Sequence, residues 1–391
     1  MKRRIWNSRI ISVGVLVLLL LTLLSGQVPA ANLPADREIT NAVDRQLMFN
    51  STTPFHLIDV ETYDGVVTLK GTVNDILAKE RAVRVAQMVK GVRAVVDEME
   101  VDAPPRSDLT LESEIRVALV NDPATETYEI TVEANDGVVT LDGTVDSWQE
   151  KQVAAYVAKG VKGVEEIINN IDLDYQVERT DEEINEDIRK ALRFDVRVDD
   201  ALLDVEVQDG KVFLSGTVGS AAEKQMATSI AWVRGVESVD NRDVEVSLWA
   251  RNEDLRKNKF EKKTDEEVKQ AVEDAFFYDP RVSSFKPEVS VENGFVTLTG
   301  IVSNLQAKRA AENDARNVVG VFGVDNYLKV RPNNIPPDSE LAADITNLLR
   351  ESPLVQRWQM NVDVINGMVY LNVEVESWSE AAATSKSMVV P

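Results

Sequence analysis

The chain has 391 residues, of which 44% are apolar and 28% charged, a composition typical of a folded protein with two or three domains. It contains no cysteine and one histidine, His56, which excludes disulfides, cysteine nucleophiles, His-based triads and multi-histidine metal sites. Lys and Arg number 43 against 66 Asp and Glu, so the net charge of −23 argues against a nucleic-acid partner. Binding or structural work is favoured, and we expect no catalytic residue, metal, cofactor or small-molecule substrate.

The first 31 residues differ from the rest of the chain. A basic start precedes an apolar run over Ile10–Leu24, and Val28-Pro29-Ala30-Ala31 follows. This is the layout of a secretory signal peptide, with cleavage after Ala30 or Ala31. The alternative is an uncleaved membrane anchor, although the apolar run is shorter than the ~20 residues that span a bilayer. We predict an exported, periplasmic protein, and removal of four basic residues changes its charge from −23 to −27.

A short pattern, Asp or Asn followed by Gly-x-Val-x-Leu, recurs five times along the chain. It occurs at Asp64-Gly65, Asp136-Gly137, Asp209-Gly210, Asn293-Gly294 and Asn366-Gly367. The glycines are 72, 73, 84 and 73 residues apart, a spacing that indicates small domains in tandem. The predicted copies span 36–102, 108–174, 180–247, 264–331 and, incomplete, 337–391, with a basic linker at 248–263.

Each copy begins with a predicted amphipathic helix. Copies three and four open with Thr and, three residues later, Glu, which is the capping-box pattern; copies one and five open with Asp. The expected N-caps are Thr180, Thr264, Asp36 and Asp338. Apolar residues then recur at helical spacing, as in Ile39, Val43 and Leu47, so one face of this helix should be buried.

Two alternating strands follow the helix and are joined by the Asp-Gly or Asn-Gly turn. These residue pairs favour a type I′ hairpin, because both central residues need a positive φ. A second glycine stands six residues after the turn glycine in four copies, at Gly71, Gly143, Gly216 and Gly300. We expect close backbone approach there, with the second helix crossing over the glycine. Copy five has Val373 at this position and should pack its helix less well.

A second helix is predicted from small apolar residues at offsets of four and three, such as Ala82, Ala86 and Val89. In copy three the corresponding residues are Met226, Ile230 and Val233. The helix is expected to end at a left-handed glycine, at Gly91, Gly163, Gly235 and Gly320. A last strand follows. The predicted fold class is α+β, with tandem α-β-β-α-β modules that each have a three-stranded sheet and two helices on one face.

The hairpin block DGKVFLSGTV at 209–218 and the ending GVESVDN at 235–241 resemble the BON domain, named for bacterial OsmY and nodulation proteins. The resemblance covers four complete copies and the incomplete fifth. It implies an exported or envelope protein that binds phospholipid surfaces or other envelope components, often in osmotic or envelope stress. It supplies no catalytic residues.

Eleven residues after each turn glycine, a residue stands at the start of the second helix. These residues are Ile76, Trp148, Ala221, Leu305 and Trp378. Two explanations are open. The large ones, Ile76, Trp148, Leu305 and Trp378, could anchor the protein at the level of lipid headgroups. Alternatively, they are hydrophobic staples that cover the end of a small core.

The linker is the most basic stretch of the mature chain. Its candidate contacts to anionic headgroups are Arg251, Arg256, Lys257, Lys259, Lys262 and Lys263. A solvated helical linker is the alternative. Because the whole chain is strongly acidic, it should be repelled by a strongly anionic membrane, so lipid binding should depend on apolar insertion or on this linker.

The sequence therefore predicts a non-catalytic exported protein that associates with phospholipid or cell-envelope surfaces. Several weakly binding modules in one chain can act together through avidity. The alternative is a chaperone-like or scaffold protein that holds other envelope proteins on its unpaired sheet edges, with copy five as the first candidate.

Overall fold

The computed structural model describes residues 34–50, 55–125, 128–175, 178–256, 259, 262–332, 336–351 and 360–373. The chain divides into Met1–Leu33 and Pro34–Pro391. The predicted signal segment falls in the first part, outside the described residues. Within the described part of the chain, no helix is long and apolar enough to cross a membrane.

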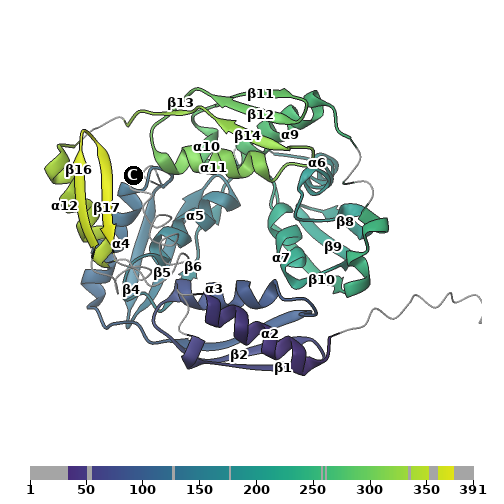
Figure 1. Ribbon diagram of the computed structural model, residues 1–391, viewed down its shortest axis with the longest axis horizontal. Helices are drawn as coiled ribbons and strands as arrows, with labels where there is room; N and C mark the ends of the chain where they lie inside the picture. The colour runs from purple at the N-terminus through teal and green to yellow at the C-terminus, as the bar shows by residue number, and fades with distance from the viewer. Residues whose placement is uncertain are drawn as a thin grey trace, which may run out of the picture. The chain divides into compact units, whose positions relative to one another are not determined.

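One module recurs along the second part of the chain (Figure 1). Its first helices are α2 (Asp36–Phe49), α4 (Asp108–Asn121), α6 (Asp181–Phe194), α9 (Asp265–Tyr278) and α12 (Asp338–Glu351). Its hairpins are β1 (Ile58–Tyr63) with β2 (Val66–Val73), β4 (Ile130–Asn135) with β5 (Val138–Val145), β8 (Leu203–Gln208) with β9 (Lys211–Val218), β11 (Glu288–Glu292) with β12 (Phe295–Thr299), and β16 (Met360–Ile365) with β17 (Met368–Val373).

The second helix and the third strand complete copies one to four. The helices are α3 (Ile76–Gln87), α5 (Trp148–Lys159), α7 (Ala221–Ile230) and α11 (Leu305–Arg316). The strands are β3 (Ala94–Val101), β6 (Glu166–Asn169) with β7 (Asp172–Leu173), β10 (Ser238–Val246), and β14 (Gly323–Asn326) with β15 (Lys329–Val330), the last paired with β13 (Ile301–Val302). Short helical turns are η1 (Phe55–Leu57), η2 (Asp200–Leu202), η3 (Leu248–Arg251), η4 (Glu253–Arg256) and α10 (Pro280–Ser283).

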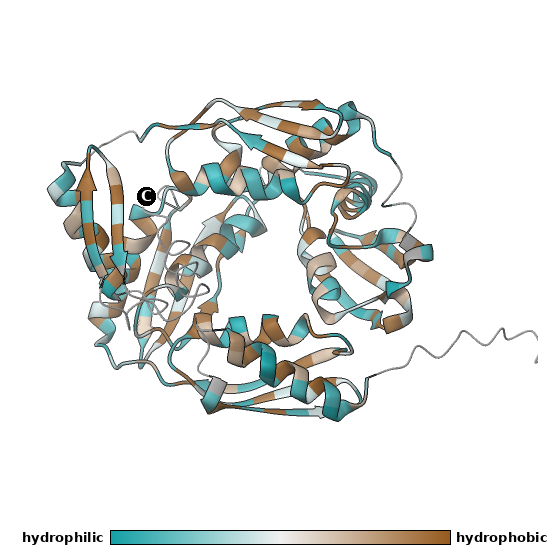
Figure 2. Ribbon diagram, in the orientation of Figure 1, coloured by the Kyte–Doolittle hydropathy of each residue, from teal (hydrophilic) through white to brown (hydrophobic). Residues whose placement is uncertain are grey.

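The sheet of each complete copy has the hairpin's second strand in the middle. In copy one, β1 pairs with β2 antiparallel, and β3 pairs with β2 parallel. A parallel third strand requires a crossover, and α3 supplies it. The two helices cover one face, so the inward residues of the strand alternate with polar ones (Figure 2). Val67 and Leu69 of β2 are fully buried against Val43 of α2 and Ala82 of α3. The predicted α+β module is confirmed.

The hairpin turn is held by the first helix. Asp209 and Gly210 have φ values of 49° and 71°, as a type I′ turn requires, and the other four turns also have positive φ. The Asp181 carboxylate accepts hydrogen bonds from the backbone N–H groups of Asp209 and Gly210 at 2.8 and 2.9 Å. Equivalent bonds from the turn are accepted by Asp36, Asp108, Asp265 and Asp338.

Two of the four predicted N-caps are confirmed and two are wrong. The capping boxes at Thr180 and Thr264 are confirmed. Asp36 is not the N-cap of its helix, because Ala35 has that position and Asp36 is the first helical residue. Asp338 is likewise the first residue of α12. These aspartates face the turn rather than the end of their own helix.

Replacing Asp181 with alanine is expected to destabilise copy three by about 1–2 kcal/mol, because two charge-assisted hydrogen bonds at a partly exposed site are lost. Glu182→Ala is the matched control: it removes a neighbouring exposed acid from the same helical turn and leaves the hairpin bonds intact. Amide hydrogen exchange of β8 and β9 in the two variants measures the difference. Equal protection in both would show that the bond to the turn contributes nothing.

The glycine inside the second strand is confirmed as a point of close approach, but the predicted partner is wrong. A Cβ on Gly71 would lie 2.0 Å from the Leu57 carbonyl oxygen, and one on Gly216 would lie 2.0 Å from that of Leu202. The approaching element is therefore the segment that leads into the first strand, not the second helix. The equivalent Gly300 of copy four has no such neighbour, since its nearest atom is 3.7 Å away.

Two expectations about the second helix also need correction. Gly91, Gly163, Gly235 and Gly320 have the predicted positive φ, but each lies four or five residues beyond the helix end, after one further turn of chain. In copy three, Ala227 and Ala231 are fully buried, whereas Met226 and Ile230 are only partly buried. Two of the three predicted buried positions are therefore shifted by one residue, whereas the predicted Val233 is buried.

Candidate binding surfaces

The residues at the start of the second helix have different surroundings in each copy. Ile76 is 9% exposed, so it is not displayed on the surface as an anchor. Ala221 is buried and joins the core of copy one. Leu305 is 36% exposed. Trp378 lies outside the described residues.

Trp148 is engaged with copy three. Its ring stacks on that of Trp232, with centroids 5.4 Å apart and planes 6° from parallel. The neighbouring Gln149 side chain donates a hydrogen bond to the Trp232 carbonyl oxygen at 2.7 Å. The half-buried Trp148 ring thus has a partner within the chain. A role as an interfacial anchor would require it to leave this stack.

The basic linker is fastened to copy three through Lys259. The Lys259 ammonium donates to the carbonyl oxygens of Leu192 and Arg193 at 2.6 and 2.8 Å and forms an ion pair with Asp200 at 3.1 Å. These carbonyls end α6, where a cation is favoured by the helix dipole. Burial lowers the pKa of Lys259, and Asp200 opposes the shift. With 9% of its side chain exposed, Lys259 does not face a headgroup.

The other linker residues differ in exposure. Arg251 and Lys262 are exposed, and the Lys263 ammonium lies 5.9 Å from the centroid of the Phe194 ring. Lys257 and the side chain of Arg256 lie outside the described residues. The linker begins with two short 3₁₀ turns, η3 and η4.

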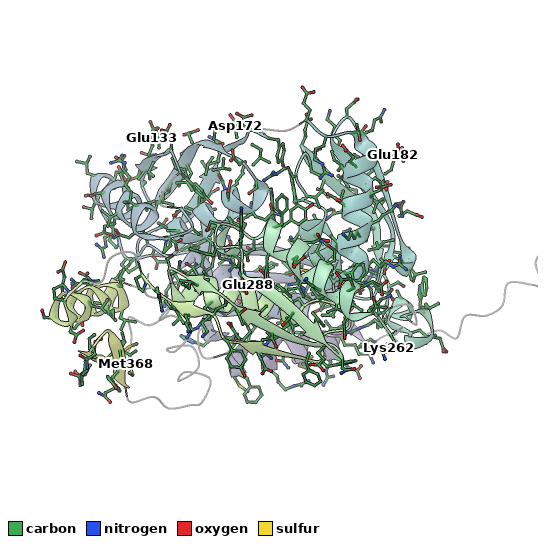
Figure 3. The ribbon with its side chains drawn as sticks, turned by 90° about the horizontal axis from the view of Figure 1, so that it is seen from above. Glu133, Asp172, Glu182, Lys262, Glu288 and Met368 are labelled. Carbon is green, nitrogen blue, oxygen red and sulfur yellow. The ribbon has the colours of Figure 1, made fainter. Side chains whose placement is uncertain are left out.

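The outer face of the sheet in copy four carries large apolar side chains. Its inward residues are buried, so the residues between them point away from the core. We call the aromatic face four exposed residues on or next to the strands of copy four: Phe295 at 55% exposed, Ile301 at 52%, Phe322 at 76% and Tyr327 at 64%. The view in Figure 3 is turned towards this sheet and labels Glu288, which lies on the adjacent edge strand β11.

Each of the two phenylalanines has its ring close to a glycine of copy four. Phe295 is the register partner of Gly323, and its ring approaches that glycine. The Phe322 ring lies over the turn glycine Gly294.

Copies one to three have a charged residue where copy four has Phe322. These residues, each two positions after the terminal glycine, are Arg93, Glu165 and Glu237. Arg93 forms an ion pair with the turn acid Asp64 at 2.8 Å. The aromatic face was not predicted from the sequence, although the change from a charged residue to Phe322 distinguishes copy four from copies one to three. Copy five presents Ile365, Met368 and Tyr370, all at least 45% exposed, near its turn.

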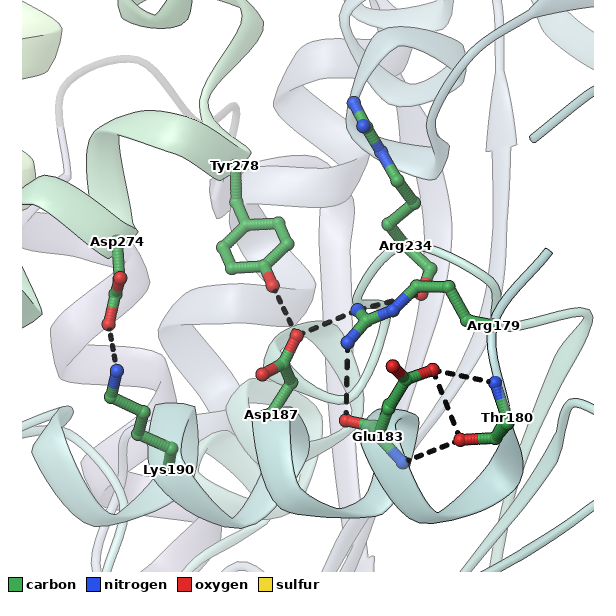
Figure 4. A network of polar contacts seen from close by, with 8 residues as sticks. All are labelled: Arg179, Thr180, Glu183, Asp187, Lys190, Arg234, Asp274 and Tyr278. Atoms are coloured by element: carbon green, nitrogen blue, oxygen red, sulfur yellow. Dashed lines mark hydrogen bonds and ion pairs between the residues drawn. The ribbon is translucent and has the colours of Figure 1, made fainter. Parts of the chain in front are cut away.

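Copies three and four are joined through their first helices (Figure 4). The Tyr278 hydroxyl donates to the Asp187 carboxylate at 2.8 Å, and Arg179 forms an ion pair with the same carboxylate at 2.7 Å. Lys190 and Asp274 form a second ion pair at 2.6 Å. Burial, and then the bond to Asp187, raise the pKa of Tyr278. This pairing was not predictable from the sequence, because each residue alone resembles an ordinary surface residue.

A buried carboxylate lies close to this junction. Asp314 of α11 has a buried Oδ2 with no hydrogen-bond partner, although the residue as a whole is partly exposed. It lies beside Asp279, which is also bonded by the Arg281 guanidinium. Burial, followed by the charge of Asp279, raises the pKa of Asp314, while Arg281 and Arg197 act in the opposite direction. No group of three or more His, Cys, Asp or Glu within the described ranges is placed to hold a metal ion.

Parts of the chain are similar to known proteins. Osmotically-inducible protein Y of Escherichia coli (strain K12) is 37% identical over 147 residues, which are 36% of this chain and 73% of that protein. The uncharacterized protein in the gshII 5′ region of Anaplasma centrale is 29% identical over 125 residues, 30% of this chain and 83% of that protein. Among solved structures, one described as the C-terminal domain of CdsD, the structural protein of the Type III secretion system of Chlamydia trachomatis, covers 55% of this chain and 100% of its own, with 14% identity and a TM-score of 0.16.

The family comparison covers most of the chain. The model of the BON domain matches residues 35–103, 107–175, 180–247 and 264–332. These four matches coincide with the four complete copies of the α-β-β-α-β module. The chain is a tandem-repeat member of the BON domain family.

Proposed function

We propose that this protein is a non-catalytic exported protein that associates with phospholipid surfaces of the cell envelope, and that the aromatic face of copy four inserts into them. The single observation that carries the proposal is the exposure of four large apolar side chains of copy four: Phe295, Ile301, Phe322 and Tyr327. Exposed apolar groups of this kind mark interaction sites, and aromatic rings are well suited to the headgroup level of a membrane.

Membership of the BON family supports this proposal, since the family resemblance implies phospholipid binding. The similarity to an osmotically inducible protein supports a role in osmotic or envelope stress. The charge of −23 on the chain, or −27 without the first 31 residues, sets the expected lipid preference. Repulsion from anionic headgroups should make binding to zwitterionic vesicles at least as strong as binding to anionic ones.

Phe322→Glu is expected to weaken vesicle binding at least about tenfold, because the insertion energy of one phenylalanine side chain is lost. The variant should fold, since Glu165 and Glu237 occupy the same position in copies two and three. Flotation of the full chain with zwitterionic vesicles measures the effect. Tyr63→Ser is the matched control, because it removes an aromatic side chain that is 84% exposed near the turn of copy one.

Three results would contradict the proposal. The wild-type chain could fail to float with either kind of vesicle, or Phe322→Glu could bind as well as wild type. Alternatively, Trp148→Ser alone could abolish binding, which would assign the contact to the start of the second helix. Suppression of client aggregation without lipid would favour the chaperone-like alternative.

A further inference from the structure

The pairing of copies three and four has a local twofold character. Lys190 lies nine residues after Asp181, the first residue of α6, and Asp274 lies nine residues after Asp265, the first residue of α9. These equivalent residues contact each other in the 2.6 Å ion pair. When equivalent positions of two similar modules meet, the arrangement is that of an isologous interface. Here the two sides differ, and opposite charges at the centre make them complementary.

The same pairing has a donor and acceptor beside its centre. Tyr278, thirteen residues after the start of α9, donates its hydroxyl to Asp187, six residues after the start of α6. Asp187 is held by Arg179, which lies two residues before the start of α6. The receiving group is thus an acid fixed by an arginine of its own module.

Copy two has this receiving group on α4. Arg106 lies two residues before Asp108, and Glu114 lies six residues after it; the two form an ion pair at 2.9 Å. The residue thirteen positions after Asp108 is Asn121, an exposed amide that can donate a hydrogen bond. Copy two therefore carries both the acceptor, an acid held by an arginine, and the donor, whereas copy three supplies only the acceptor and copy four only the donor.

The centre of the equivalent surface on α4 is apolar. Val117, nine residues after Asp108, is 55% exposed, and Val120, at the position of Phe277, is 64% exposed. Two valines can pack against each other across a twofold axis. The lysine of copy three or the aspartate of copy four would instead face the identical charge of the second chain, which is repulsive. Copy one has Arg45 at this position and is excluded for the same reason.

We propose that α4 is a dimerisation face that binds α4 of a second copy of this chain. Val117 of the two chains meet at the twofold axis, and Glu114 of each chain accepts a hydrogen bond from Asn121 of the other. One pair of helices makes a small interface, so the dimer is weak and its population depends on concentration. The inference is independent of the proposed lipid binding.

Sedimentation equilibrium of the full mature chain tests this proposal. The wild type should show a monomer–dimer equilibrium, and Val117→Asp and Val117→Lys should each weaken it at least about tenfold through like-charge contact. Mixing the two variants should restore the dimer, because it recreates the Lys190–Asp274 pair. Leu109→Ser is the matched control: it removes an apolar side chain that is 79% exposed on the same helix, about two turns from Val117, and should leave the equilibrium unchanged.

A wild-type chain that stays monomeric up to its solubility limit would overturn the proposal. Dimers that persist in both charged variants, or charged variants that do not associate when mixed, would also overturn it. Circular dichroism and thermal unfolding of each variant separate loss of association from loss of fold. If Val117→Asp instead reduced vesicle binding of a strictly monomeric chain, the face would belong to a membrane and not to a second copy.

Discussion

Replacing Gly71 or Gly216 with alanine is expected to destabilise the module concerned by roughly 3–5 kcal/mol. The φ angles of these glycines are 114° and 116°, in a region that L-residues rarely adopt. The new Cβ would also lie 2.0 Å from a backbone carbonyl oxygen, that of Leu57 or Leu202. A carbonyl at the start of a strand cannot move away without displacing the strand, so the strain and the overlap add.

Gly300→Ala separates the two contributions. Gly300 has a similar φ of 125°, but the nearest atom to a built Cβ is the Leu328 Cδ2 at 3.7 Å. Only backbone strain should therefore appear, at roughly 1–3 kcal/mol. Amide hydrogen exchange in the full chain reports each module separately: β2 for Gly71→Ala and β12 for Gly300→Ala. Equal loss of protection in the two variants would contradict the close approach in copy one.

Replacing Asp314 with asparagine is expected to stabilise copy four by about 1–3 kcal/mol at pH 8, because the wild-type carboxyl group must there either bury a charge or take up a proton on folding. Asparagine is nearly isosteric and can donate its amide to Asp279. The pKa of Asp314 is raised in the folded state, so the folded chain holds a proton that the unfolded chain has released. The contribution of Asp314 to stability is therefore complete below its unfolded pKa and is lost as the pH rises through the folded pKa.

The difference between Asp314→Asn and wild type should accordingly be small near pH 4 and should grow in favour of the variant towards pH 8. Denaturant unfolding at a series of pH values measures it. Asp325→Asn is the control for removing one negative charge, because Asp325 is exposed in the same module. If both substitutions gave the same pH-independent gain, the effect would come from the overall charge and not from the buried site.

The fold was predictable from the sequence because its signals are local and repeated. The turn pairs at Asp209-Gly210 and Asn293-Gly294 require positive φ, and the capping boxes at Thr180 and Thr264 place two helix starts. Each of these features depends on a few neighbouring residues. Recurrence in five copies then distinguished the pattern from chance.

The corrected features depend on residues that are distant along the chain. Asp36 binds a turn 28 residues later, and Gly71 is approached by Leu57, from the segment that leads into the first strand. The stripe of α7 is shifted because copy three has one residue fewer between Gly216 and Gly235 than copy one has between Gly71 and Gly91. Local spacing alone does not reveal such contacts.

The binding surfaces were less predictable than the fold. Position alone suggested Ile76 and Trp148 as anchors, but one is buried and the other stacks on Trp232. Lys259 was predicted as a basic residue available to headgroups, and instead its ammonium donates a hydrogen bond to a carbonyl oxygen in the last turn of α6. Phe295 and Phe322 were overlooked because exposure is decided by the two faces of the folded sheet. Comparing each copy with the others at equivalent positions would have identified Phe322.

The insertion of copy four can be tested directly because the chain has no cysteine, so one introduced thiol is labelled uniquely. An environment-sensitive fluorophore on Phe322→Cys should shift its emission to shorter wavelength when zwitterionic vesicles are added. The same fluorophore on Glu182→Cys, at an exposed site of copy three, should not respond. Emission from position 322 that stays water-like while the chain floats with the vesicles would contradict the assignment of the aromatic face as the lipid contact.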